Sequence, residues 1–222
     1  GVVCAVELNK RLKDNPVKDP TLNINFLFCP ETIGSIAYFA NNEHKIKSTD
    51  SAFFIEMLGH KDDDDFMLQH SRNKNDKINR IFEYVLSKSN KKYHTRSFAR
   101  WNDEGNINGP GLNIPCPFLM KGTPSEDSRP YFNTNFYDEY HTSDDNPEII
   151  SEKKLDESVD IIEQVVRIYC SDYKPKQLEK GIIFLSGLDM HKSFYDDPDA
   201  GIFMDKIVYL LEGNMSVFEI AI

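Results

Sequence analysis

Two apolar stretches, Leu22–Cys29 and Ser51–Gly59, constrain the fold of this chain more than any other part of its sequence. The first alternates and then becomes wholly apolar, which is typical of a strand that enters a sheet covered on both faces. A lone carboxylate follows the first stretch at Glu31, and another lies near the end of the second at Glu56. Because open α/β sheets bind ligands at the carboxyl ends of their strands, we expect a ligand site there.

Amphipathic patterns around these stretches predict the helices that cover the sheet. Apolar residues recur at helical spacing in residues 2–14, 36–42, 74–88 and 151–169. Further strands are predicted at Phe66–His70, which is expected to be antiparallel, and at Leu112–Leu119, whose prolines favour an edge of the sheet. The pattern as a whole predicts a three-layer α/β/α sandwich with a mixed central sheet. Tyr93–Gly122 is rich in Asn, Gly and Pro, and we expect it to form an irregular binding wall or lid.

The character of the chain changes after Pro175, which predicts a main domain over residues 1–174 and a small module over 175–222. In this module a polar turn precedes the apolar segment Ile202–Leu211, and Gly213–Ser216 then opens another helix. A helix, a turn and a capped helix are typical of the start of a winged-helix unit, and an ordinary helical hairpin fits the same pattern.

Composition excludes several classes of protein. The 222 residues carry a formal charge of -10, so a general nucleic-acid binder is excluded, because a phosphate backbone needs a cationic protein face. The four cysteines form no Cys-x-x-Cys pair, which favours a reduced, cytoplasmic setting. No apolar run reaches the roughly 20 residues that a membrane span requires. A homo-oligomer remains open.

The stretch Tyr137–Asn146 places one imidazole, His141, among four carboxylates and two phenols. A catalytic zinc site takes three ligands from His, Asp or Glu side chains and leaves one position for water. Glu31, Glu56 and His141 are candidates for such a set. Each also has a simpler explanation: a hydrogen-bonded loop histidine, an acid at a helix start, or an acid paired with Lys or Arg.

Two other acidic clusters permit a structural and a functional interpretation. The run His60–Asp65 contains many potential ligands, yet consecutive acids in a tight turn mostly face water. Asp103 and Glu104 are candidates to bind the amine of a substrate, because a free amino terminus needs a carboxylate partner; solvated loop acids are the alternative.

Four motifs in this order carry a resemblance to a known family: Phe28–Tyr38, Phe53–Gly59, Gly109–Pro115 and Glu139–Asn146. Together they resemble the aminopeptidase-like proteins associated with polysaccharide biosynthesis, which are relatives of the zinc aminopeptidase and glutaminyl cyclase superfamily. The resemblance covers about residues 1–172 and implies one or two zinc ions.

The resemblance also implies roles for individual residues. The superfamily has two adjacent glutamates, one a general base and one a ligand, whereas here Glu31 stands alone between Pro30 and Thr32, so its role is open between the two. The segment that begins at Glu56 matches the next ligand motif. The last motif implies three roles: His141 as the last ligand, Tyr140 as the donor to the oxyanion, and Asp145 as a residue that orients the site from outside the ligand shell.

One part of the superfamily pattern is missing from the chain. Its first His and its metal-bridging Asp would fall before Gly1, and the sequence starts without Met inside a helical pattern. We therefore expect a fragment whose upstream residues matter.

These observations predict a zinc-dependent, aminopeptidase-like hydrolase that cleaves a small peptide or amide. Two alternatives remain. One is a non-catalytic or regulatory domain that binds a metabolite in polysaccharide biosynthesis, and the other is an enzyme of the same fold with different chemistry.

Overall fold

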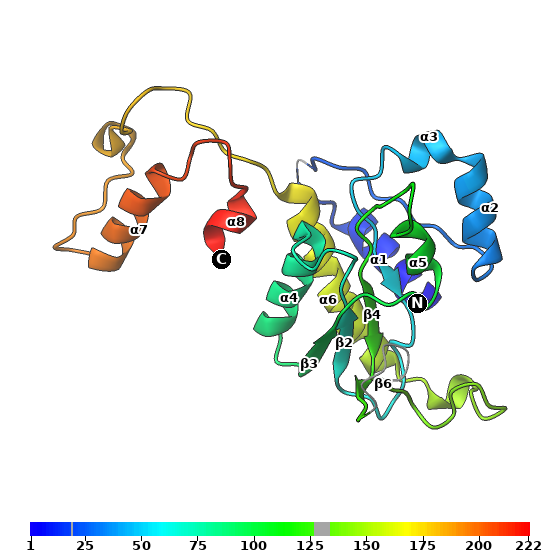
Figure 1. Cartoon of the computed structure of the whole chain (residues 1–222). Helices are drawn as coiled ribbons and strands as arrows, with labels where there is room; N and C mark the ends of the chain where they lie inside the picture. Colours follow the sequence, from blue (N-terminus) through cyan, green and yellow to red (C-terminus); the bar gives the residue numbers. More distant parts are fainter. Residues whose placement is uncertain (19, 127–133) are drawn as a thin grey trace. The chain divides into compact units, whose positions relative to one another are not determined.

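The computed structural model describes residues 1–18, 20–126 and 134–222 (Figure 1). They form two compact units. The first comprises Gly1–Val17 and Ile24–Tyr169, and the second comprises Lys18–Asn23 and Cys170–Ile222. The domain boundary predicted after residue 174 stays a prediction, and each unit is described by itself.

A four-stranded mixed sheet forms the centre of the first unit. Its strands are, in order across the sheet, β1 (Phe54–Ile55), β4 (Phe118–Lys121), β2 (Phe66–Gln69) and β3 (Tyr93–Arg96). β1 is parallel to β4 and β2 is parallel to β3, whereas β2 and β4 are antiparallel. All residues of β2 and β4 are buried, as expected for strands that are covered on both faces. The predicted mixed sheet is therefore confirmed.

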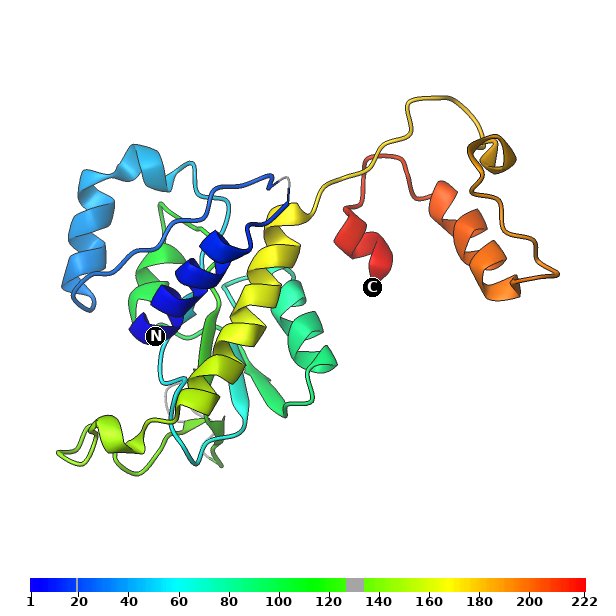
Figure 2. The ribbon, with the colours of Figure 1, turned by 180° about the vertical axis from the view of Figure 1, so that it is seen from behind.

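Three long helices cover one face of this sheet (Figure 2): α1 (Val2–Asp14), α4 (Lys77–Lys88) and α6 (Glu152–Ser171). Arg11 of α1 pairs with Asp156 and Asp160 of α6 at 3.2 and 2.6 Å. Lys77 of α4 lies over the ring of Tyr169 in α6, with its Nζ 4.6 Å from the ring centroid. α6 thus contacts both other helices, and the three helices predicted from periodicity are confirmed.

The other face of the sheet carries a core of Met67, Phe118 and Met120. Partly buried side chains pack against this core: Phe54, Met57, Trp101 and Phe136. Two of these side chains, Trp101 and Phe136, come from loops and contact each other edge to face at 5.1 Å. The third layer of the predicted sandwich stays a prediction.

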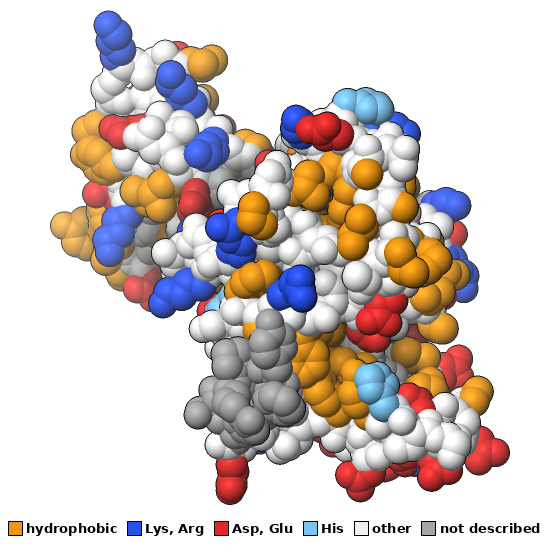
Figure 3. Space-filling model, turned by 45° about the vertical axis from the view of Figure 1, so that its right-hand side comes forward, with side chains coloured by type: hydrophobic (Ala, Val, Ile, Leu, Met, Phe, Trp, Pro, Cys, Tyr) orange, Lys and Arg blue, Asp and Glu red, His pale blue; other side chains and the backbone are white. Residues whose placement is uncertain are grey.

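The segment Leu22–Cys29 corrects one prediction. The structure gives it no secondary structure, and the side chain of Phe28 is 52% exposed. Within the described residues, no backbone hydrogen bond joins residues 22–29 to any other segment. The prediction of a buried strand is therefore wrong, because the apolar pattern has no neighbouring strand against which to pack. Figure 3 shows that hydrophobic side chains are exposed on the face drawn there. Ile33 and Ile36 are, like Phe28, among the exposed large hydrophobic residues.

Shorter elements complete the first unit: α2 (Ile33–Asn41), α3 (Glu43–Ile46), α5 (Asp103–Ile107), β5 (Thr123–Pro124), β6 (Thr134–Asn135) and η1 (Pro147–Ile149). The helix predicted at 36–42 corresponds to α2. β3 and α5 lie inside Tyr93–Gly122, so the prediction of an irregular binding wall there is wrong for these elements. β4 overlaps the end of the strand predicted at Leu112–Leu119, but it lies between β1 and β2 and not at the predicted edge.

The second unit contains a short 3-10 helix and two helices: η2 (Leu185–Leu188), α7 (Pro198–Val208) and α8 (Val217–Ala221). Ser216 and Glu219 form a capping box at the start of α8, which confirms a helix opening at Gly213–Ser216. The winged-helix interpretation stays a prediction. Throughout the described part of the chain, helices lack the combination of length and hydrophobicity that crossing a membrane requires.

Phe82 of α4 provides a test of the helix-covered core, because its side chain is fully buried and packs edge to face against Phe53 at 5.5 Å. Phe82→Ala should lower the free energy of unfolding by about 3–5 kcal/mol, since it leaves a cavity. Urea denaturation followed by circular dichroism measures this. Val6→Ala, at a position that is 56% exposed, should change it by less than about 0.5 kcal/mol. Equal effects of the two substitutions would contradict this core.

Candidate functional site

Two of the predicted carboxylates approach each other at one edge of the sheet. Glu56 directly follows β1, and Glu31 lies in the turn before α2. The side-chain amide of Asn102 donates to Oε2 of Glu56 at 3.1 Å. Burial raises the pKa of Glu56, and the negative charge of Glu31 is the next largest cause of the rise. The two acids therefore lie near enough to interact, although they are 25 positions apart in the sequence.

The turn that carries Glu31 is unusually tight. A Cβ on Gly34 would lie 2.6 Å from the ring of Pro30 and 2.7 Å from the Cβ of Cys29, so only glycine fits there. The backbone N–H of Thr32 donates to Asp103 at 3.0 Å. These contacts fix the position of Glu31, whose side chain is exposed.

Tyr140 brings the loop Tyr137–Asn146 to the same place. Burial raises the pKa of Tyr140, and the next causes are the negative charges of Glu56 and then Glu31. The hydroxyl therefore stays protonated and can donate a hydrogen bond. The hydroxyl of Tyr137 donates to Oδ2 of Asp145 at 3.0 Å, which closes this loop on itself.

His141 lies beside Tyr140, and their rings stack with centroids 3.9 Å apart. Its side chain is exposed. Across residues 1–18, 20–126 and 134–222, no group of three or more His, Cys, Asp or Glu side chains is arranged to hold a metal ion. The residues predicted as ligands, Glu31, Glu56 and His141, thus do not form a metal site as they are placed here. Their role stays a prediction.

Backbone strain concentrates around these predicted residues. Among the described residues, five that are not glycine have positive φ: Thr32, Met57, Asn113, His141 and Asp189. The first two directly follow Glu31 and Glu56, and the fourth is itself a predicted ligand. Thr32, which is β-branched, and Met57 rarely adopt left-handed backbone, and residues in such conformations cluster at functional sites. The strain supports a functional role for this edge of the sheet.

Asp103 and Glu104 are held inside the protein. Asp103 accepts a hydrogen bond from the hydroxyl of Ser35. Glu104 is fully buried, and its carboxylate accepts from the backbone N–H groups of Trp101 and Asn102 at 2.8 and 2.9 Å. Burial raises its pKa, and these hydrogen bonds act in the opposite direction. Both acids thus shape the loop beside Glu56, and their predicted contact with a substrate amine stays a prediction.

Sequence reasoning missed two contributors to the site. Asn102 binds Glu56 from a loop that carries no local signal for this contact. His60 was assigned to a solvated turn, yet its side chain is only 6% exposed and stacks on Tyr137 at 4.9 Å. The prediction is wrong for His60, whereas Asp62 and Asp64 of the same turn are exposed as expected.

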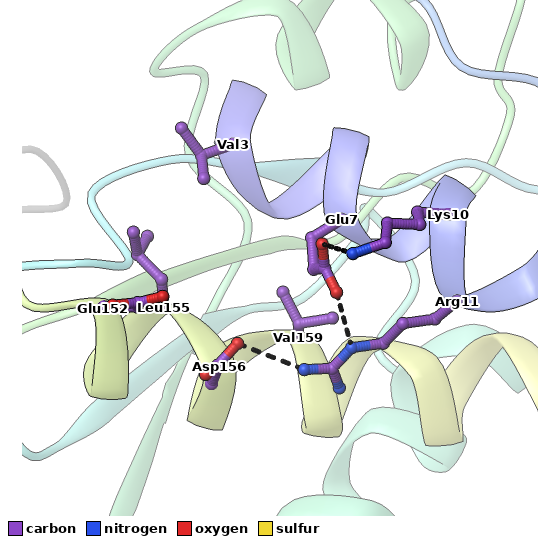
Figure 4. Close-up of a pocket in the computed structure, with 8 residues that line it drawn as sticks. All are labelled: Val3, Glu7, Lys10, Arg11, Glu152, Leu155, Asp156 and Val159. Atoms are coloured by element: carbon purple, nitrogen blue, oxygen red, sulfur yellow. Dashed lines mark hydrogen bonds and ion pairs between the residues drawn. The ribbon is translucent and has the colours of Figure 1, made fainter.

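Figure 4 shows a separate groove, of about 410 Å³, between α1 and α6. Arg11 points across it toward Asp156 and also pairs with Glu7 on its own helix. The side chains that line the groove are Val3, Glu7, Lys10, Arg11, Glu152, Leu155, Asp156 and Val159. None of them belongs to the predicted site. A neighbouring recess of about 600 Å³ includes Asp145 but none of Glu31, Glu56, Tyr140 and His141.

This chain is similar to known proteins in sequence and in fold. The family described as "Domain of unknown function (DUF4910)" matches residues 1–172. A Clostridium acetobutylicum protein, whose name proposes a polysaccharide biosynthesis protein with an aminopeptidase-like domain, is 33% identical over 124 residues. That match covers 54% of this chain and 25% of the relative.

A crystal structure of a proposed peptidase from Clostridium acetobutylicum has a TM-score of 0.75 and 23% identity. It covers 98% of this chain and 47% of that chain, which establishes a shared fold. A zinc aminopeptidase from Bacillus subtilis has a TM-score of 0.46 and 17% identity, covering 60% of this chain and 32% of its own. This score is too low to compare the two folds. The chain thus spans a quarter of the curated relative and under half of the first solved structure.

Glu104 provides a test of the loop beside Glu56. Glu104→Gln should lower the free energy of unfolding by about 1–3 kcal/mol, because an amide group cannot accept from two backbone N–H groups as a carboxylate does. Urea denaturation at pH 7 measures this, with Glu43→Gln on the exposed helix α3 as the matched control. An unchanged stability would show that Glu104 is not structural.

Proposed function

We propose that this chain, which belongs to the family described as a domain of unknown function (DUF4910), is an aminopeptidase-like hydrolase of a small peptide or amide. The convergence of Glu31, Glu56 and Tyr140 at one strained edge of the sheet carries the proposal. The aminopeptidase-like domain in the name of the Clostridium acetobutylicum relative supports it.

The chemistry of these groups suits the attack of water on a carbonyl. Glu31 is exposed and can take a proton from the attacking water. Tyr140 keeps its hydroxyl proton, because its pKa is raised, and it can donate to the carbonyl oxygen as negative charge develops there. Burial raises the pKa of Glu56, with the charge of Glu31 as the next largest cause, so Glu56 holds a proton more readily than a free carboxyl group does.

Zinc binding is a separate part of the proposal. The side chains as arranged do not fit a zinc ion, because the described residues contain no group of three ligands for a metal. We propose that Glu31, Glu56 and His141 bind it once further donors complete the set, and that these donors belong to a longer polypeptide. We also propose the three-layer sandwich for the first unit and a winged-helix start for the second.

Glu31→Gln tests the proposed hydrolysis. It should lower kcat for an aminoacyl amide by about 10²–10⁴-fold, since it removes a proton acceptor and leaves the shape of the side chain unchanged. The enzyme for this assay is the longest natural polypeptide that contains this chain. The rate is measured as release of the amine from the aminoacyl amide. Glu43→Gln, a carboxylate in the exposed helix α3, should leave it unchanged. Full activity in Glu31→Gln would remove both roles proposed for this residue.

Metal analysis tests the zinc proposal separately. The same polypeptide, purified without chelator, should carry at least about one zinc ion per chain, and His141→Ala should lose zinc because a ligand is removed. Elemental analysis after gel filtration measures this, and His44→Ala, an exposed histidine in α3, should retain the metal. Less than stoichiometric zinc in the unsubstituted protein would contradict the proposal.

A non-catalytic domain that binds a metabolite is the second candidate. The lack of a three-ligand metal group among the described residues favours it. It differs from the first candidate in its response to Glu31→Gln, because binding without hydrolysis does not need a proton acceptor. Calorimetric binding of a nucleotide-sugar without any hydrolysis of aminoacyl amides would support this alternative over the hydrolase.

A further inference from the structure

Buried His60 contacts both arms of the loop that carries Tyr140 and His141. Its backbone forms an antiparallel bridge with Ile150, just after this loop. Next to this bridge, the N–H of Lys61 donates to the carbonyl of Ile149 at 2.9 Å, and the N–H of Ser151 donates to the carbonyl of Gly59 at 2.8 Å. The segment around His60 therefore fixes the end of the loop.

The imidazole of His60 contacts the start of the same loop. Its ring stacks on Tyr137 with centroids 4.9 Å apart and an interplanar angle of 16°. Its Nε2 lies 3.3 Å from Oε2 of Glu139, at ion-pair distance although without the angles of a hydrogen bond. The N–H of Asp62 donates to Nδ1 at 3.3 Å, and Oδ2 of Asp63 lies 3.7 Å from the same nitrogen, so both ring nitrogens have polar neighbours. The imidazole thus has a fixed orientation.

Aromatic contacts continue from this imidazole to the predicted site. Tyr137 contacts Tyr140 edge to face at 5.7 Å, and Tyr140 stacks on His141 at 3.9 Å. Phe136 also contacts Tyr140 at 4.8 Å. Four rings, from His60 through Tyr137 and Tyr140 to His141, thus connect the buried turn with the exposed ring. A change at the buried end of this series alters the support of the exposed end.

We infer that His60 is a positioning residue: its buried imidazole holds Tyr137 and Glu139 and thereby places Tyr140, on which His141 stacks, beside Glu31 and Glu56. The inference rests on the proposed function for its catalytic consequence, whereas the placement of the loop does not depend on it. Stacking of the His60 ring orients the ring of Tyr137, and the contact of Nε2 with Glu139 holds the backbone two residues further along the loop. His60 itself touches no substrate.

Three substitutions separate these contacts. His60→Ala removes both, His60→Phe keeps the ring that stacks on Tyr137 and removes the nitrogen that faces Glu139, and His60→Gln keeps a donor and removes the ring. His44→Ala, at an exposed position in α3, is the control. If His60→Ala does not fold, the Phe and Gln variants decide the outcome, because both retain most of the side-chain volume.

Hydrogen–deuterium exchange of the backbone amides, resolved by mass spectrometry, reads out the loop without any substrate. In His60→Ala, the amides of residues 137–145 should exchange about tenfold faster or more, whereas those of α4 and α6 keep their rates. His60→Phe and His60→Gln should each restore part of the protection. Unchanged exchange in the loop, or equal acceleration throughout the first unit, would overturn the inference.

Activity adds the catalytic consequence. Where the polypeptide hydrolyses aminoacyl amides, His60→Ala should lower kcat about tenfold or more with KM changed less. The reason is that a displaced Tyr140 no longer donates its hydrogen bond to the oxyanion, which forms only in the transition state. Faster loop exchange in a protein without hydrolysis would uphold the positioning role and refute the proposed function. Lost activity with unchanged loop exchange would refute the positioning role alone.

Discussion

The hydrogen bonds of β4 to its two neighbours are the interaction on which the first unit depends. β4 is antiparallel to β2 and parallel to β1, so it joins the two halves of the sheet. The N–H groups of Phe54 and Glu56 donate to the carbonyls of Pro117 and Leu119 at 2.9 and 3.3 Å. The N–H of Lys121 in β4 donates in turn to the carbonyl of Met57 at 3.3 Å, so β4 holds the backbone on both sides of the Glu56 side chain. These backbone hydrogen bonds to β4 thus fix the position from which the Glu56 side chain extends.

Local sequence patterns predicted the elements that need no particular packing partner. The helix at residues 2–14 has one apolar face, and any apolar surface suffices to bury it. Leu22–Cys29 differs, because a strand needs a hydrogen-bonded neighbour and the described residues supply none. β3 was missed for the opposite reason: Tyr93–Arg96 is polar in composition, and its pairing with β2 makes it a strand.

Prediction of the site had the same physical limit. Strand ends and an acidic, aromatic loop pointed to Glu56 and to Tyr140, and the structure brings both near Glu31. The contact of His60 with Tyr137 joins distant parts of the sequence, so the spacing of residues along the chain does not predict it. The positive φ of Met57 is equally invisible in the sequence, because methionine does not favour that backbone. The closeness of the charged side chains and the strained backbone conformations thus became visible only in the folded structure.

The distribution of carboxylates also bears on which group would receive a substrate amine. Asp103 and Glu104 are buried and accept hydrogen bonds from the protein, so their charge is already compensated. Glu31 is exposed, and its charge is the second largest cause of the raised pKa of Glu56, after burial. A positively charged amine beside this pair would relieve that repulsion, whereas a carboxylate would increase it. On the proposed function, repulsion between these two acids is itself a reason to prefer the amino end of a peptide.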